Sequence, residues 1–408
     1  MKFNESELFV TLNDLELPLI FPYWYALQDE LEKYNFIKSL DQLGSRIKFI
    51  DNKIEIPNLG EVFIESLFRF DRFIFLNNEI VEKNMKGLKA NFSCDYSVGI
   101  DLNLIKYISN CIFGYNNDTS FIAFHTIKYL VENNINYDFN LFYWENHEAL
   151  NHDQIYSSNN FLNNMKAIEI MKDLDEAYFL RTGKIRAKCN KATILQRIDD
   201  VVINKQRMSI IDPNFYSNLW RLTYLSMLIT IYLKYSSRKS NTYKLSQLLE
   251  IYDKEIGLML LRDFSYARYF LENPSLSFFS FIQPNNPKLF KKLRSLAWDL
   301  HISRILERFS AAPHNANFMI PYVMTYDKRY SNMLKVFKIE SLLFQRGYMP
   351  LASPEENIRS IVTSAPEWES YFSMTRHKER IDNFTNSDDN FENMIIKYEG
   401  LVSNLLRF

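Results

Sequence analysis

The sequence has little cysteine, little glycine and almost no net charge. Its 408 residues include 9 Gly and 3 Cys, and the formal net charge is -1. Cys94, Cys111 and Cys189 are scattered without CxxC spacing, which argues against a disulfide framework and a zinc site and fits a reducing compartment. Because no global basic field is present, any contact with nucleic acid must come from a local patch.

Long apolar runs are missing too. The most apolar stretch, residues 222–233, is too short to cross ~30 Å of hydrocarbon and is bounded by Arg221 and Lys234, so it predicts a buried helix. The first 13 residues lack a basic region followed by an apolar core, and we expect no signal peptide. These patterns predict a cytoplasmic protein with no membrane role.

Several catalytic signatures do not occur. The sequence contains no GxxxxGK[ST], GxGxxG, GxSxG or HExxH spacing. This argues against P-loop, dinucleotide-binding, α/β-hydrolase and HExxH metalloprotease functions.

What is present is the composition of a globular mixed α/β chain, with 47% hydrophobic and 24% charged residues. The length predicts two or three domains. We expect an N-terminal α+β subdomain over residues 1–90, a central domain over 91–345 with a helical insertion at about 160–272, and a C-terminal helical tail over 346–408. Strands that alternate with helices predict parallel pairing in the central domain.

Individual elements follow from hydrophobic periodicity. They are a hairpin over residues 46–63 that turns at Asp51-Asn52, strands over 96–100, 138–144 and 318–325, and helices over 102–113, 120–133, 288–309 and 328–343.

Two of these strands end on an aspartate that opens a helix. Asp101 follows Val98-Gly99-Ile100, and Asp327 follows Val323-Met324-Thr325-Tyr326. Carboxyl ends of parallel strands lie at one edge of a sheet, where ligands bind. If the strands are neighbours, ~4.8 Å apart, the two carboxylates converge. The alternative is that each aspartate is only a helix N-cap.

Further acids could join this pair. Asp299 has no basic residue three or four positions away, so no helical ion pair explains it. Glu145 ends the apolar run 141–144, and Glu148 is the other choice for the same role. Carboxylates that face one another repel unless a cation is present, and oxygen ligands without His or Cys suit Mg²⁺ or Mn²⁺.

These motifs resemble those of the PIN-like nuclease family. The similarity lies in the strand that ends at Asp101-Leu102-Asn103 and in the block from Ala297 through Asp299 to Asp327-Lys328-Arg329. The resemblance implies a Rossmann-like parallel sheet flanked by helices, with Asp101, Glu145, Asp299 and Asp327 binding Mg²⁺ or Mn²⁺. It places Asn103, Lys328 and Arg329 near the scissile phosphate. It also implies cleavage of RNA, less often DNA, in some members as a bacterial toxin or antiviral effector.

A basic segment lies within the expected helical insertion. Residues 178–197 contain no acid and six cations, among them Arg181, Lys184, Arg186 and Lys188. They could grip phosphates, or they could be an ordinary solvated loop. The alternative to a nuclease is a catalytically inert scaffold that binds a partner through its helical insertion. A protein partner and a homo-oligomer both stay open.

Overall fold

The structure, a computed structural model, describes residues 5–146, 152–208, 213–354, 368, 370, 371, 376, 379, 380 and 390–406. The chain divides into two compact units. Unit 1 comprises Met1–Ile211 and Ser303–Ser353, and unit 2 comprises Asp212–Ile302 and Pro354–Phe408. Among the described residues, no helix has the length and apolar character needed to cross a membrane.

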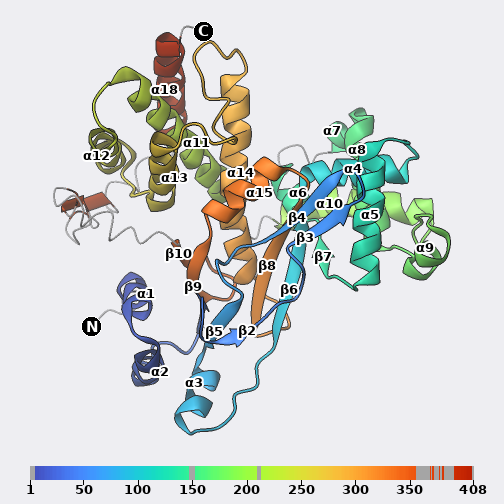
Figure 1. The fold of residues 1–408 in the computed structure, drawn as a ribbon, viewed down its shortest axis with the longest axis horizontal. Coiled ribbons are helices and arrows are strands. Elements are labelled where there is room, and N and C mark those ends of the chain that lie inside the picture. The colour runs from blue at the N-terminus through green and yellow to red at the C-terminus, as the bar shows by residue number, and fades with distance from the viewer. Residues whose placement is uncertain are drawn as a thin grey trace. The chain divides into compact units, whose positions relative to one another are not determined.

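Unit 1 contains two open sheets (Figure 1). Their strands are β1 (Tyr34–Leu40), β2 (Ser45–Arg46), β3 (Lys53–Ile56), β4 (Gly60–Ser66), β5 (Arg72–Leu76), β6 (Cys94–Ile100), β7 (Tyr137–Asp138), β8 (Phe318–Thr325), β9 (Ile339–Gln345) and β10 (Leu351–Pro354). The first sheet has the order β10-β9-β1-β5-β2 and the second has the order β3-β4-β8-β6-β7.

Eleven helices lie wholly within the described part of unit 1. They are α1 (Glu5–Asp14), α2 (Leu17–Ala26), α3 (Asn78–Met85), α4 (Leu102–Ile112), α5 (Asp118–Glu132), α6 (Asn140–Glu145), α7 (His152–Ser157), α8 (Asn159–Lys172), α9 (Glu176–Thr182), α10 (Lys191–Met208) and α15 (Lys328–Val336). Helices α1 and α2 bury Leu12 and Trp24 in one apolar cluster with Phe36 of β1 and Leu343 of β9.

The second sheet confirms the central sequence prediction. Strand β6 is parallel to β8, with Gly99 opposite Val323 and Ile100 opposite Met324. Strand β7 is also parallel to β6. The mixed α/β class is therefore confirmed, but the parallel part is limited to β7, β6 and β8. The β3–β4 hairpin extends the sheet antiparallel to β8.

The units do not follow the expected boundaries at residues 90/91 and 345/346. Strand β1 pairs with β9, and β4 pairs with β8. The N-terminal strands β1 and β4 are thus part of the same sheets as residues 318–345. Their main-chain N–H and C=O groups form hydrogen bonds with β9 and β8, so neither part is a separate domain.

Three local predictions were wrong. The hairpin turns at residues 57–59 and not at Asp51-Asn52; Asn58 in this turn has φ of 62°, and Gly60, which begins β4, has φ of 92°. Residues 140–145 form α6, so the strand expected over 138–144 is confined to β7. The helix expected over 328–343 ends at Val336, and β9 follows.

Unit 2 is helical. It contains α11 (Pro213–Ser236), α12 (Asn241–Ile251), the π-helix η1 (Tyr252–Ile256), α13 (Leu261–Glu272), residues 289–302 of α14 (Leu289–Ser310), and α18 (Asn390–Leu406). The buried helix predicted over 222–233 is confirmed within α11, where Leu225 and Leu228 are fully buried. Helix α14, predicted over 288–309, is also confirmed.

Candidate functional site

The two predicted aspartates follow the carboxyl ends of neighbouring strands: Asp101 comes directly after β6, and Asp327 lies two residues beyond the end of β8. Each aspartate is the N-cap of the next helix: the Asp101 carboxylate accepts from the Asn103 N–H at 2.6 Å, and that of Asp327 accepts from the Arg329 N–H at 2.8 Å. Both aspartates are therefore helix N-caps. Their burial and their neighbours determine whether they can also bind a ligand.

A threonine links the two acids. The buried Thr325 hydroxyl donates to the Asp101 carboxylate, and the same oxygen accepts from the Asp327 N–H at 3.0 Å. Thr325 thus fixes the end of β8 against the start of α4. Sequence reasoning missed it, because only the β6–β8 register brings residue 325 to residue 101.

Burial perturbs the pKa of two acids at this edge. Burial raises the pKa of Asp101 to about 6, the Thr325 and Asn103 hydrogen bonds oppose the shift, and the Asp327 charge adds to it. Burial raises the pKa of Glu145 to about 7, and the Asp101 charge raises it further. The exposed ammonium of Lys106 lowers the pKa of both. Asp101 is therefore coupled electrostatically to both Glu145 and Asp327, and these three acids are called the acid group below.

Glu145 belongs to this group for a different reason from the one expected. It does not follow a strand but is the last residue of α6, whose Leu141 packs on Gly99 of β6. The short helix thereby brings Glu145 to the acid edge. Glu148, the alternative second acid, lies outside the described residues.

Asp299 lies in unit 2. Its stretch of α14 packs there, where the Leu300 carbonyl accepts from the Tyr266 hydroxyl and Trp298 stacks on Trp220. The acid group of unit 1 consequently consists of Asp101, Glu145 and Asp327.

The donor set at this edge is all oxygen, as Mg²⁺ and Mn²⁺ prefer. Asp101 and Glu145 could bind such an ion, because a cation would offset the burial that raises their pKa values. Within the described residues, no three His, Cys, Asp or Glu side chains form a ready-made metal-binding group. An ion would therefore take further ligands from water or substrate, as Mg²⁺ commonly does.

A cavity of about 420 Å³ adjoins Asp327. It is lined by Asn103, Tyr107, Tyr326, Asp327, Lys328 and Arg329. Asn103, Lys328 and Arg329, the residues predicted near the scissile phosphate, thus lie together beside Asp327. The Lys328 side chain is exposed and has no ion pair within the described part of the chain, whereas Arg329 lies 3.6 Å from Asp327.

Two tyrosines of this cavity were not predicted. The rings of Tyr107 and Tyr326 meet edge to face at 5.9 Å, and the Tyr326 hydroxyl donates to the Leu59 carbonyl. Tyr107 lies on α4 one turn beyond Asn103, a helical spacing that could have indicated the shared position.

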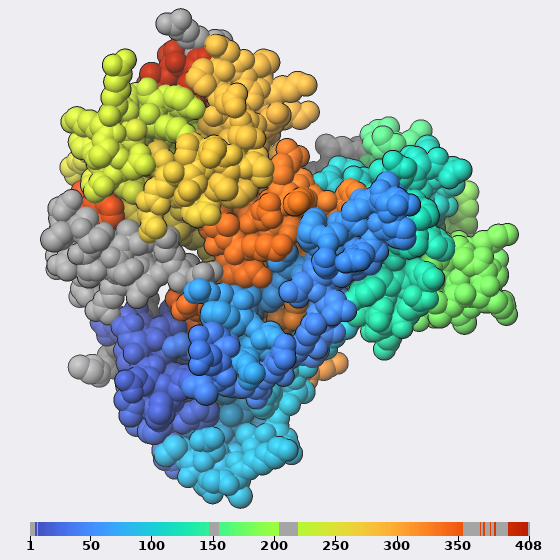
Figure 2. All heavy atoms as spheres, viewed as in Figure 1, coloured from blue at the N-terminus to red at the C-terminus, as the bar shows by residue number. Residues whose placement is uncertain are grey.

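The four predicted phosphate-binding cations of the basic segment lie between residues 181 and 188, at the end of α9 and in the loop after it. Helix α9 packs on α5 (Figure 2). Arg186 forms an ion pair with Asp175 at 2.6 Å and stacks over Tyr178. Asp175 lies just before residues 178–197, the stretch that contains no acid. Arg181, Lys184 and Lys188 are exposed and have no ion pair among the described residues. None of the four predicted cations is among the residues that line the cavity beside Asp327.

Comparisons with models of protein families, with curated protein sequences and with solved structures found no match to this chain.

Proposed function

We propose that unit 1 is a metal-dependent nuclease of the PIN-like type that cleaves RNA. The observation that carries the proposal is a set of three acids: Asp101 and Asp327 follow adjacent parallel strands, and the charge of Asp101 couples it to the half-buried Glu145. Helix capping alone does not require buried ionisable groups, since Asn and Ser cap as well as Asp.

The side chains suit phosphodiester hydrolysis. Asp101 and Glu145 would hold Mg²⁺ or Mn²⁺ and the charge of Asp327 would help to attract the ion, which when bound would supply activation of water and stabilisation of the leaving oxygen. Lys328, Arg329 and Asn103 would bind the phosphate through charge and hydrogen bonds. A bound cation would favour the ionised form of Glu145, whose pKa burial raises to about 7.

The test is cleavage by the purified full chain. Labelled RNA and DNA strands are incubated with MgCl₂, MnCl₂ or EDTA, and products are resolved on denaturing gels. We expect RNA cleavage with either metal and none with EDTA. Asp101→Asn and Asp327→Asn should each reduce the rate by orders of magnitude, because the charge that holds the ion is lost.

The matched control is Asp118→Asn, an exposed acid in the first turn of α5 away from the acid group. It should cleave at the wild-type rate. The capping function alone predicts that Asp327→Asn is also silent. A purified Asp327→Asn protein that cuts RNA as fast as wild type would therefore contradict the proposal. It would favour the alternative function, a catalytically inert scaffold.

A further inference from the structure

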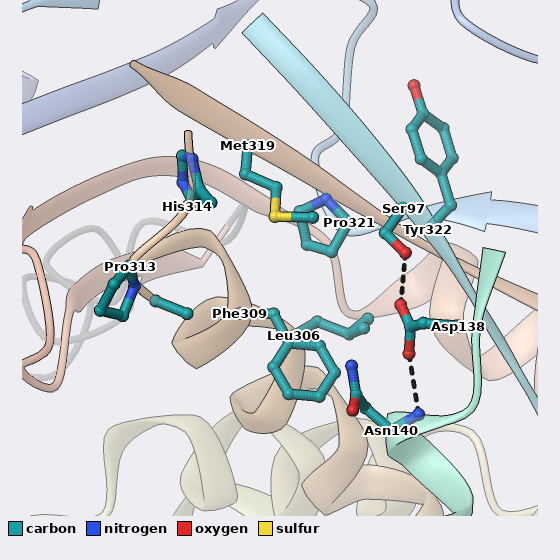
Figure 3. Close-up of a pocket in the computed structure, with 12 residues that line it drawn as sticks. Ser97, Asp138, Asn140, Leu306, Phe309, Pro313, His314, Met319, Pro321 and Tyr322 are labelled. Atoms are coloured by element: carbon teal, nitrogen blue, oxygen red, sulfur yellow. Dashed lines mark hydrogen bonds between the residues drawn. The ribbon is translucent and has the colours of Figure 1, made fainter. Parts of the chain in front are cut away.

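A second cavity lies on the face of the same sheet, before the strand ends. Its volume is about 210 Å³, and its lining includes Ser97 and Gly99 of β6, Met319 and Pro321 of β8, and Asp138 and Asn140 around the start of α6 (Figure 3). Residues two apart on a strand share a face, so these strand residues form one wall. Asp101, Glu145 and Asp327 are not among the residues that line it, so this cavity is distinct from the acid group.

Two apolar walls define its shape. Leu306 and Phe309, near the end of α14, face Met319 and Pro321 across the cavity (Figure 3). Ligand pockets for drug-sized molecules measure ~300–1,000 Å³, so this cavity selects something smaller. An aromatic ring opposite aliphatic groups suits a flat ring inserted between them.

One edge of the cavity is polar. The Asp138 carboxylate is oriented by the Ser97 hydroxyl and by the Asn140 N–H, which donates at 2.8 Å. The Asn140 amide points into the cavity and has no hydrogen bond within the described residues (Figure 3). An amide offers one acceptor and two donors, while each carboxylate oxygen retains a free lone pair. This edge can therefore both donate to a ligand and accept from it.

Charge narrows the ligand class further. The Asp138 carboxylate disfavours an anion at the polar edge. His314 lines the cavity as well, and burial lowers its pKa, so its ring adds no positive charge near pH 7. The surroundings thus favour an uncharged molecule over a nucleotide phosphate.

We propose that this cavity binds an uncharged adenine base or nucleoside. Its ring would lie between Phe309 and Pro321, and its edge would face Asn140. Asparagine pairs with adenine through two hydrogen bonds, to N6 and N7, which neither guanine nor uracil can reproduce. Such a site is independent of cleavage at the acid group.

The proposal is tested by isothermal titration of the full chain with adenosine, inosine, guanosine and uridine. Adenosine should bind, and inosine, which lacks the N6 amino group, should bind about tenfold more weakly. Asn140→Ala should weaken adenosine binding about tenfold or more. Ala312→Phe should abolish it by filling the cavity while leaving Asn140 intact. The exposed Asn116→Ala is the matched control and should bind like wild type.

Circular dichroism establishes whether each variant is folded. If Asn140→Ala is unfolded, adenosine binding by Ala312→Phe tests the proposal instead. Absence of heat with every nucleoside at millimolar concentration would overturn the proposal. So would adenosine binding that both variants retain, or equal affinity for inosine. A chain that binds adenosine without cutting RNA would support this site and refute only the nuclease function.

Discussion

Replacing Asp101 by asparagine should make the protein more stable at alkaline pH, even though it removes a helix-capping carboxylate. Asp101 is 7% exposed and caps α4. Asparagine has nearly the same shape and caps about as well. The Thr325 hydroxyl, which now donates to the carboxylate, can instead accept from the new amide.

The expected size follows from the pKa. Burial raises the pKa of Asp101 from 3.8 to about 6, a shift worth about 3 kcal/mol. A carboxyl whose folded-state pKa is raised imposes no cost below its unfolded pKa, where both states are protonated. The cost then grows as the pH rises from the unfolded-state pKa to the folded-state pKa, and it is complete above the folded-state pKa. Asp101→Asn should therefore gain about 3 kcal/mol over wild type near pH ~8 and almost nothing near pH ~4.

Urea unfolding at the two pH values, with EDTA present, measures this difference. Asp327→Asn is the control, because it makes the same substitution at a helix N-cap whose side chain is 30% exposed. Its stability should change by less than about 0.5 kcal/mol at either pH. If Asp101→Asn loses equal stability at both pH values, the carboxylate is a structural cap and the burial argument fails.

Three further outcomes are expected. MgCl₂ or MnCl₂ should raise the melting temperature of the wild type at neutral pH but not that of Asp101→Asn, since only the native acid group binds the ion; equal shifts in a thermal scan would contradict this. Replacing the unpaired cations of the basic segment, Arg181, Lys184 and Lys188, should reduce the salt dependence of RNA binding by about 0.7 in logarithmic slope per lost phosphate contact; an unchanged slope would make this segment ordinary surface. Gly99→Ala should cost about 1–3 kcal/mol in urea unfolding, because a Cβ there would lie 3.0 Å from the Leu141 Cδ1. The control Gly400→Ala, in open space on α18, should instead add up to about 1 kcal/mol.

The sequence predicted the core of the sheet well, because both central strands carry their own signals. Strands β6 and β8 are apolar, and each ends at an aspartate that caps the following helix. These signals are local, so they survive without knowledge of the fold. The parallel pairing of the two strands then followed from the rule that helices connect parallel strands.

The wrong predictions share one cause, which is that tertiary contacts decide short apolar runs. Residues 141–144 are consecutively apolar, and such a run fits a strand or a buried helix turn equally. Here the Asp138 carboxylate accepts from the Asn140 N–H, which turns the chain and starts α6. Residues 339–345 likewise became a strand because β1, about 300 positions earlier in the chain, offers its edge.

The same distinction separates the predictable from the unpredictable part of the site. Asp101, Asp327, Asn103 and Lys328 could be identified from adjacent residues, whereas the Thr325 bridge depends on a register between distant strands.

Burial is what turns two helix caps into a candidate site. Asp327, 30% exposed, could cap α15 at little cost in any sheet. Asp101 and Glu145 are different, because burial raises the pKa of Asp101 to about 6 and that of Glu145 to about 7, while exposed Lys106 only partly offsets the effect. Asparagine or serine at position 101 would cap α4 without that cost. Ligands commonly bind at this edge of a parallel sheet, and two buried ionisable groups there lower the stability of the protein. We therefore expect the pair to have a function that offsets this cost, which is to bind a cation.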